Sequence, residues 1–214
     1  MKKVLFSAVV FFTVISNAQD IKFGAKVGLN ISNFSGDVTD SKSLIGAQLG
    51  GFAEISISDK FAIQPELLFS MQGAKSEYSE SFTGDSYREE SKSKLNYLNI
   101  PILAKYYVGD KFAVLAGPQF GILMSAKENY DITETIAGTT DSYSGSVDAK
   151  DFYKTLAVSF NIGAAYSITE NIFVDARYNL GLSSIAKDFT DEFGDSTSAD
   201  IKNNVIQFSV GYKF

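Results

Sequence analysis

The chain has 214 residues, a formal net charge of −6 and an isoelectric point near 4.7, and this acidic balance argues against a nucleic-acid partner. It contains no cysteine, which excludes disulfides, thiolate nucleophiles and sulfur-bound metals. It also contains no histidine, so the usual general base and the commonest metal ligand are missing. We therefore expect neither a cofactor nor an enzymatic activity.

The N-terminus has the features of a secretory signal peptide. Lys2 and Lys3 form a positively charged start, and an apolar run over 4–15 is followed by small residues. The apolar run is shorter than the roughly 20 residues that a spanning helix needs. We predict a signal peptide over 1–18 and a single mature domain over 19–214. The alternative is that the apolar run is a buried first strand or helix.

Alternating segments fill the rest of the chain, with apolar residues on one face and polar residues on the other. They predict eight strands, over 22–34, 45–57, 61–74, 95–108, 112–126, 155–168, 172–183 and 204–214. Turn-forming triplets close three hairpins, at 58–60, 109–111 and 169–171. The other four connections are long and polar, at 36–44, 75–94, 127–154 and 184–203.

Short turns at one end and long loops at the other are typical of bacterial outer-membrane barrels, in which the turns are periplasmic and the loops extracellular. A soluble lipocalin-type barrel has the same alternation, with its apolar face turned inward. Full-length apolar faces, long loops at one end only and aromatic residues near strand ends favour the membrane barrel. Those aromatic residues are Phe61, Tyr106, Phe112, Tyr166, Tyr212 and Phe214. We predict an all-β fold, an eight-stranded antiparallel transmembrane β-barrel.

The last strand indicates where the protein resides. Residues 205–214 alternate without interruption and end on Phe214. A terminal Phe of this kind is what the outer-membrane barrel-assembly machinery commonly receives. We expect export to the periplasm followed by insertion into the cell outer membrane. The expected surroundings are outer-membrane lipid and lipopolysaccharide.

Several short motifs resemble a known family. They are Lys-Val-Gly-Leu-Asn at 26–30, Gln-Pro-Glu-Leu-Leu-Phe-Ser at 64–70, the run 97–107, Ala-Gly-Pro-Gln-Phe-Gly at 116–121, and Ala-Arg-Tyr-Asn-Leu-Gly-Leu at 176–182. The chain resembles the Bacteroidetes outer-membrane β-barrel (PorT-like porin) family over the whole mature length. Such proteins are mostly barrels of unassigned function, and one relative belongs to the gliding and type IX secretion apparatus. The architecture also resembles the OmpA and OmpX barrels, with no periplasmic domain expected after Phe214.

Charged residues fall on the face that we expect to line the lumen. They are Lys26, Glu54, Glu66, Lys105, Asp175, Arg177 and Lys213. Counted from the short turns, all seven lie in the periplasmic half and stack into about two layers. An eight-stranded barrel is wide enough only for its own side chains, so these charges must pair. The pairs form either an internal plug or a gate in a narrow pore; a catalytic use of Glu54, Glu66 and Asp175 is a third alternative.

The four long loops contain most of the acidic residues, with 18 Asp and Glu against 10 Lys and Arg. The densest run, 188–195, could bind calcium, although its spacing does not match an EF-hand. The alternative is a solvated acidic surface. Aromatic side chains in the loops could contact a protein partner or pack onto the barrel rim. They are Tyr78, Phe82, Tyr87, Tyr130, Tyr143, Phe189 and Phe193.

Three functions remain open from the sequence. The first is a non-enzymatic scaffold that is structural or binds a partner through its extracellular loops. The second is a narrow porin-like channel for ions or small solutes. The third, which depends on the family resemblance alone, is an accessory role in a secretion or gliding complex. No Gly-x-Ser-x-Gly motif supports a hydrolase.

Overall fold

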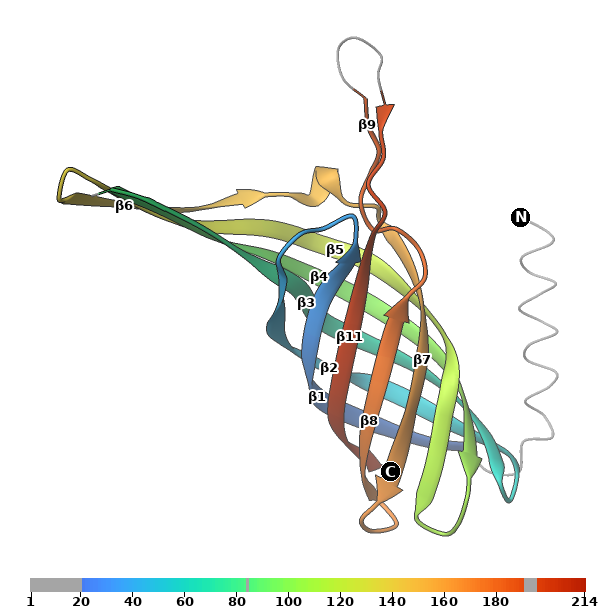
Figure 1. The fold of residues 1–214 in the computed structure, drawn as a ribbon. Helices are drawn as coiled ribbons and strands as arrows, with labels where there is room; N and C mark the ends of the chain where they lie inside the picture. Colours follow the sequence, from blue (N-terminus) through green and yellow to red (C-terminus); the bar gives the residue numbers. More distant parts are fainter. Residues whose placement is uncertain (1–20, 84, 191–195) are drawn as a thin grey trace.

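The computed structural model describes residues 21–83, 85–190 and 196–214. Eight long strands form a closed antiparallel ring, in the order β1-β2-β3-β4-β5-β7-β8-β11, and β11 pairs back to β1 (Figure 1). The strands are β1 (Ile21–Gly36), β2 (Ser41–Ser58), β3 (Phe61–Phe82), β4 (Asp85–Tyr107), β5 (Phe112–Ile136), β7 (Leu156–Ser167), β8 (Ile172–Gly181) and β11 (Ile201–Lys213). The predicted eight-stranded antiparallel barrel is confirmed. The predicted signal peptide, 1–18, lies outside the described residues.

The ring has a compact end, which we call the turn end. Here short connections join β2 to β3, β4 to β5 and β7 to β8, at the positions of the predicted triplets. Aromatic side chains surround this end on the outer surface, and Tyr106, Phe112, Tyr166 and Tyr212 are all exposed there. Along the barrel part of each strand the outward side chains are apolar and the inward ones are largely polar, and a strand period of two places them on opposite faces.

The opposite end differs from the prediction. The segments 75–94 and 127–154 were expected to be loops, but most of both is regular strand. Strands β3, β4 and β5 continue beyond the barrel, and β6 (Thr139–Asp148) pairs with the end of β5. The four strands form a sheet that projects to one side of the barrel, which we call the arm (Figure 1). Both faces of the arm are rich in polar residues, so the alternation that marks the barrel strands is weak there.

Smaller differences lie at the same end. The predicted loop 36–44 shrinks to 37–40, because the end of β1 pairs with β11 up to Gly36 and the start of β2 pairs with β3 from Ser41. A single turn of 3-10 helix, η1 (Lys150–Phe152), precedes β7, and a two-stranded ribbon, β9 (Phe189–Thr190) and β10 (Ser196–Thr197), lies between β8 and β11. Within the part of the chain that the structure describes, no helix is long and apolar enough to cross a membrane.

Apolar residues close the lumen at the arm end. Leu95, Tyr97, Leu123 and Ala126 point inward from β4 and β5, and Ala149 and Ile185 pack against them from connecting segments. We call these six residues the cap. The two connecting segments are joined to each other, since the backbone N–H of Lys154 donates to the carbonyl of Ile185 at 2.7 Å. The cap therefore covers the arm-end mouth of the barrel with buried side chains.

Candidate functional site

The structure places all seven predicted lumen charges inside the barrel, where they are between 2 and 6 % exposed. They fall into two groups. The group nearer the turn end is built around Glu54 of β2. One oxygen of its carboxylate accepts a hydrogen bond from Lys105 at 2.6 Å, and the other accepts from Lys213 at 3.0 Å and from the Tyr107 hydroxyl at 2.5 Å. This group holds two cations against one carboxylate.

The second group lies deeper and is balanced in charge. Arg177 donates from its two terminal nitrogens to both oxygens of Glu66, at 2.8 and 2.7 Å. Lys26 donates to Asp175 at 2.9 Å and lies 3.6 Å from Glu66. The Nε of Arg177 lies 3.1 Å from Oδ1 of Asp175, close enough for an ion pair, although these two atoms form no hydrogen bond. Two-pronged arginine–carboxylate contacts of this kind are strong and geometrically specific.

One neutral side chain connects the two groups. Gln64 of β3 donates to Glu66 at 2.6 Å and accepts from Lys105 at 3.2 Å. An amide can bridge in this way because it has both a donor and an acceptor. We call Gln64 and the seven charged residues the lumen network. It joins strands distant in sequence across the barrel, and Gln64 links its two groups into one continuous set of contacts.

Two aromatic rings fill the lumen beside the network. Phe52 and Phe173 meet edge to face, with ring centroids 5.4 Å apart. The ammonium groups of Lys105 and Lys213 lie 5.3 and 5.7 Å from the centroid of the Phe173 ring. Cations in this position are attracted by the negative face of the ring. The ring thus stabilises the two lysines that share the single carboxylate of Glu54.

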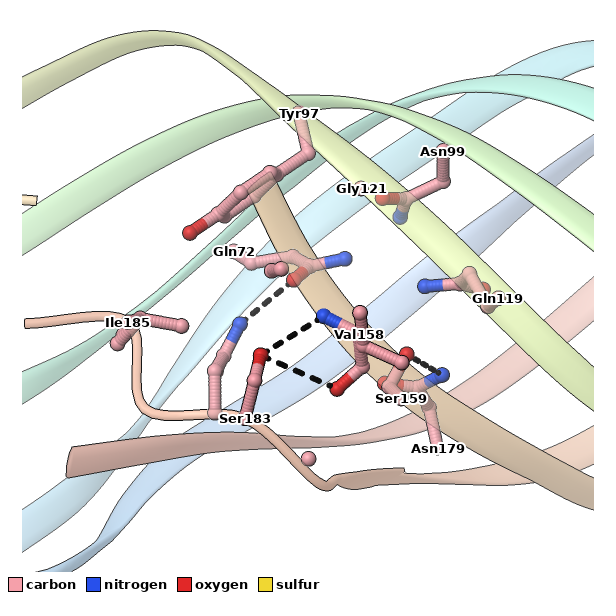
Figure 2. Close-up of a pocket in the computed structure, with 13 residues that line it drawn as sticks. Gln72, Tyr97, Asn99, Gln119, Gly121, Val158, Ser159, Asn179, Ser183 and Ile185 are labelled. Carbon is pink, nitrogen blue, oxygen red and sulfur yellow. Dashed lines mark hydrogen bonds between the residues drawn. The ribbon is translucent and has the colours of Figure 1, made fainter. Parts of the chain in front are cut away.

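Between the lumen network and the cap, the lumen is lined by uncharged polar side chains (Figure 2). Asn179 donates to Ser159 at 2.8 Å, and Asn203 donates to Gln72 at 2.6 Å. These groups surround a cavity of about 20 Å³, which is the size of a single water molecule. Hydrogen bonds between neighbouring amides hold this layer together, so it supports the strands without carrying charge.

The lumen thus contains three layers, of which the sequence predicted one. The inward charges were found because they alternate with apolar residues along their strands. The cap was missed, since Ala149 and Ile185 are single apolar residues within polar segments and no periodicity marks them. At the turn end the network faces an open bowl of about 1050 Å³, whose lining includes Glu54, Tyr107 and Lys213.

The arm has two chemically different faces. Cross-strand pairs in an antiparallel sheet share a face, so the register sorts every residue. One face, the acidic-aromatic face, contains Tyr78, Glu80, Phe82, Asp85, Tyr87, Glu89, Glu128, Tyr130, Ile132, Glu134, Ile136, Asp141, Tyr143 and Val147, together with small polar residues. Among its described residues this face has six carboxylates and no lysine or arginine.

The opposite face of the arm mixes charges. It contains Lys75, Glu77, Arg88, Glu90, Lys92, Lys94, Lys127, Asp131 and Asp148 among serine and threonine residues. Several of these are paired: Lys92 lies 2.8 Å from Glu90 and 3.7 Å from Asp131, and Glu77 is 2.6 Å from Lys42 of β2. Hydrogen bonds from Lys42 and Lys92 lower the pKa values of Glu77 and Glu90. This face therefore neutralises most of its own charge.

Five of the seven predicted loop aromatics lie on the acidic-aromatic face. The hydroxyls of Tyr78 and Tyr87 donate to Glu80 and Glu89 at 3.1 and 2.8 Å, which raises the pKa of both tyrosines. The other two aromatics, Phe189 and Phe193, carry side chains outside the described part. Of the acidic run 188–195, which could bind calcium or form a solvated surface, residues 191–195 are likewise outside it. Among the described residues, no group of three or more potential ligands could hold a metal ion.

The family of outer membrane protein beta-barrel domains matches residues 17–187, which includes every strand from β1 to β8. The chain belongs to this family, and an outer-membrane location follows from that membership. This match does not assign the chain to the predicted PorT-like group.

Solved structures of low sequence identity align over most of the chain. Ail, the attachment invasion locus protein of Yersinia pestis, in complex with the heparin analogue sucrose octasulfate, covers 92 % of this chain and 100 % of its own, with 13 % identity and a TM-score of 0.42. Neisserial surface protein A has the same coverage, with 10 % identity and a TM-score of 0.46. The outer membrane protease OmpT from Escherichia coli aligns over 92 % of this chain and 98 % of its own, with 11 % identity and a TM-score of 0.35. No curated protein sequence matches the chain.

Proposed function

We propose that the protein is a closed, non-enzymatic outer-membrane barrel that displays its arm outside the cell for a binding partner. In this arrangement the signal peptide directs export, Phe214 is recognised by the barrel-assembly machinery, and lipid and lipopolysaccharide surround the strands. The turn end faces the periplasm and the arm faces outward, as is usual for barrels with short turns at one end.

The observation that carries the proposal is the lumen network. Four cations and three carboxylates are buried across the barrel, and each of the seven contacts at least one opposite charge. Opening a path for ions would separate buried pairs, and a buried charge left without its partner costs about 3–5 kcal/mol. The cap adds a second, apolar closure. A lumen filled in this way favours a scaffold over a pore.

Single-channel conductance in a planar bilayer tests the proposal. We expect the refolded wild-type barrel to be silent and a Lys105→Ala/Arg177→Ala variant to conduct, because one cation is removed from each group of the network. A steady wild-type current would contradict the proposal and would identify a narrow porin-like channel instead. The accessory role in a secretion or gliding complex has support only from the PorT-like resemblance.

A further inference from the structure

The arm displays a face, the acidic-aromatic face, whose carboxylates form no ion pair with any residue that the structure describes. Their contacts are with neutral groups: Glu80 and Glu89 accept from tyrosines, Glu128 accepts from Ser93 at 2.7 Å, and Asp85 accepts from a backbone N–H at 2.9 Å. Six negative charges are thus gathered without a compensating cation.

The same face exposes the apolar surface of the arm. Tyr78, Phe82, Ile136, Tyr143 and Val147 are between 51 and 68 % exposed, and all of them lie on it. No large apolar side chain lies on the opposite face among the arm residues that pair in the sheet. Exposed apolar groups concentrated on one side mark interaction surfaces, and tyrosine is enriched at the centre of protein interfaces.

Three aromatic side chains of this face, Tyr78, Phe82 and Tyr143, are exposed enough to contact a partner, while Tyr87 and Tyr130 are half-buried. The rings of Tyr78 and Tyr87 are 6.2 Å apart across β3 and β4. The ring of Tyr130 covers Gly145, and a methyl group at that glycine would collide with it. Carboxylates interspersed with ring faces provide both kinds of contact that lysine and arginine make, ion pairs and cation–π contacts.

We propose that the acidic-aromatic face binds a lysine- and arginine-bearing segment of another protein, an inference that rests on the proposed function and specifies its partner. Complementary charge would speed the encounter and select against acidic surfaces. The exposed tyrosines would supply the apolar contact that holds the complex. The opposite face, which is close to neutral, serves as an internal comparison for the test.

Fluorescence anisotropy with labelled peptides tests the inference, using the full-length barrel in lipid nanodiscs. The probe is a short synthetic peptide that alternates lysine or arginine with leucine, and the control peptide has glutamate at every basic position. Three substitutions remove charge from the acidic-aromatic face, and three remove the same charge from the opposite face. The first set is Glu80→Gln, Glu134→Gln and Asp141→Asn; the matched set is Glu77→Gln, Glu90→Gln and Asp131→Asn.

We expect the basic peptide to bind and the acidic peptide not to bind. The first set should weaken binding roughly tenfold, since three exposed ion pairs are lost, while the matched set should change it less than about twofold. Tyr78→Ser with Tyr143→Ser should also weaken binding at unchanged net charge. On a gel, the band of the folded barrel should resist heating equally in all variants, because none of these residues touches the lumen.

Four results would overturn the inference. Two concern the peptide: the basic peptide does not bind, or both sets of substitutions weaken its binding equally, which indicates diffuse attraction. The other two indicate a different occupant: neutral maltohexaose binds in place of the peptide, which indicates a carbohydrate site, or the barrel forms a dimer that the first set dissociates, which indicates a second copy of the chain. A silent bilayer together with absent peptide binding refutes only this inference, and the closed barrel stands. A steady current refutes the proposed function whatever the peptide does.

Discussion

Arg177 on β8 donates hydrogen bonds to both carboxylate oxygens of Glu66 on β3. The two residues are 111 positions apart in the chain and lie on opposite sides of the lumen. Neither side chain has access to solvent, since their side-chain exposures are 1 and 0 %. Because β3 and β8 are not neighbours in the ring, their backbones share no hydrogen bonds, and this contact joins opposite walls of the barrel directly.

Arg177→Ala should destabilise the barrel by about 3–5 kcal/mol, because Glu66 and Asp175 would retain only Lys26 as a buried cation. The measurement is the urea concentration at which the folded, heat-resistant band is lost on a gel. Arg177→Lys is the matched control: it keeps the charge but not the two-pronged contact, so its loss should be smaller. If Arg177→Ala loses the folded band at the same urea concentration as the wild type, the lumen network does not stabilise the barrel.

Gly211→Ala should destabilise the barrel by about 1–3 kcal/mol through overpacking. Gly211 lies directly opposite Phe173 on the neighbouring strand, and a methyl group there would collide with the ring. The displaced ring would also leave the ammonium groups of Lys105 and Lys213. Gly109→Ala in a short turn is the control, since nothing lies within 4 Å of the added methyl. Equal losses for the two variants would refute the packing account.

Carboxyl titration by NMR should show Glu77 and Glu90 losing their charge below the ordinary pKa of 4.5. Because pairing lowers these pKa values in the folded arm, their contribution to its stability is complete above 4.5 and is lost as the pH falls through the lowered values. Lys92→Gln should raise the pKa of Glu90 back toward 4.5 and leave the pKa of Glu77 unchanged. If the pKa of Glu90 is the same in the Lys92→Gln variant as in the wild type, pairing with Lys92 is not the cause of its lowered pKa.

Trimming the arm should leave the barrel folded. Short glycine-containing turns in place of 77–90 and 129–146 remove most of the arm but none of the lumen network, so the heat-resistant band and the strand signal in circular dichroism should persist. The same variant should fail to bind the basic peptide. If the band disappears, the arm is needed for folding and is not simply a display element.

The sequence was sufficient for properties that depend on strand period alone. In an extended strand, the direction of each side chain is fixed by its position, so alternation identified Lys26, Glu54 and the other inward charges before their partners were known. Counting residues from the short turns also placed Glu66 and Arg177 at the same depth. The turn triplets located three hairpins within a residue or two, because turn chemistry is local.

Only the tertiary structure decided how these parts meet. Closure of β11 onto β1 brings Lys213 within reach of Glu54, and the ring order determines that Lys26 is paired with Asp175. The arm strands lost the barrel's alternation because neither face is covered, and their pairing depends on backbone bonds that continue from the ring. The separation of the arm into an acidic-aromatic and a mixed face follows from cross-strand register, which a single strand does not encode.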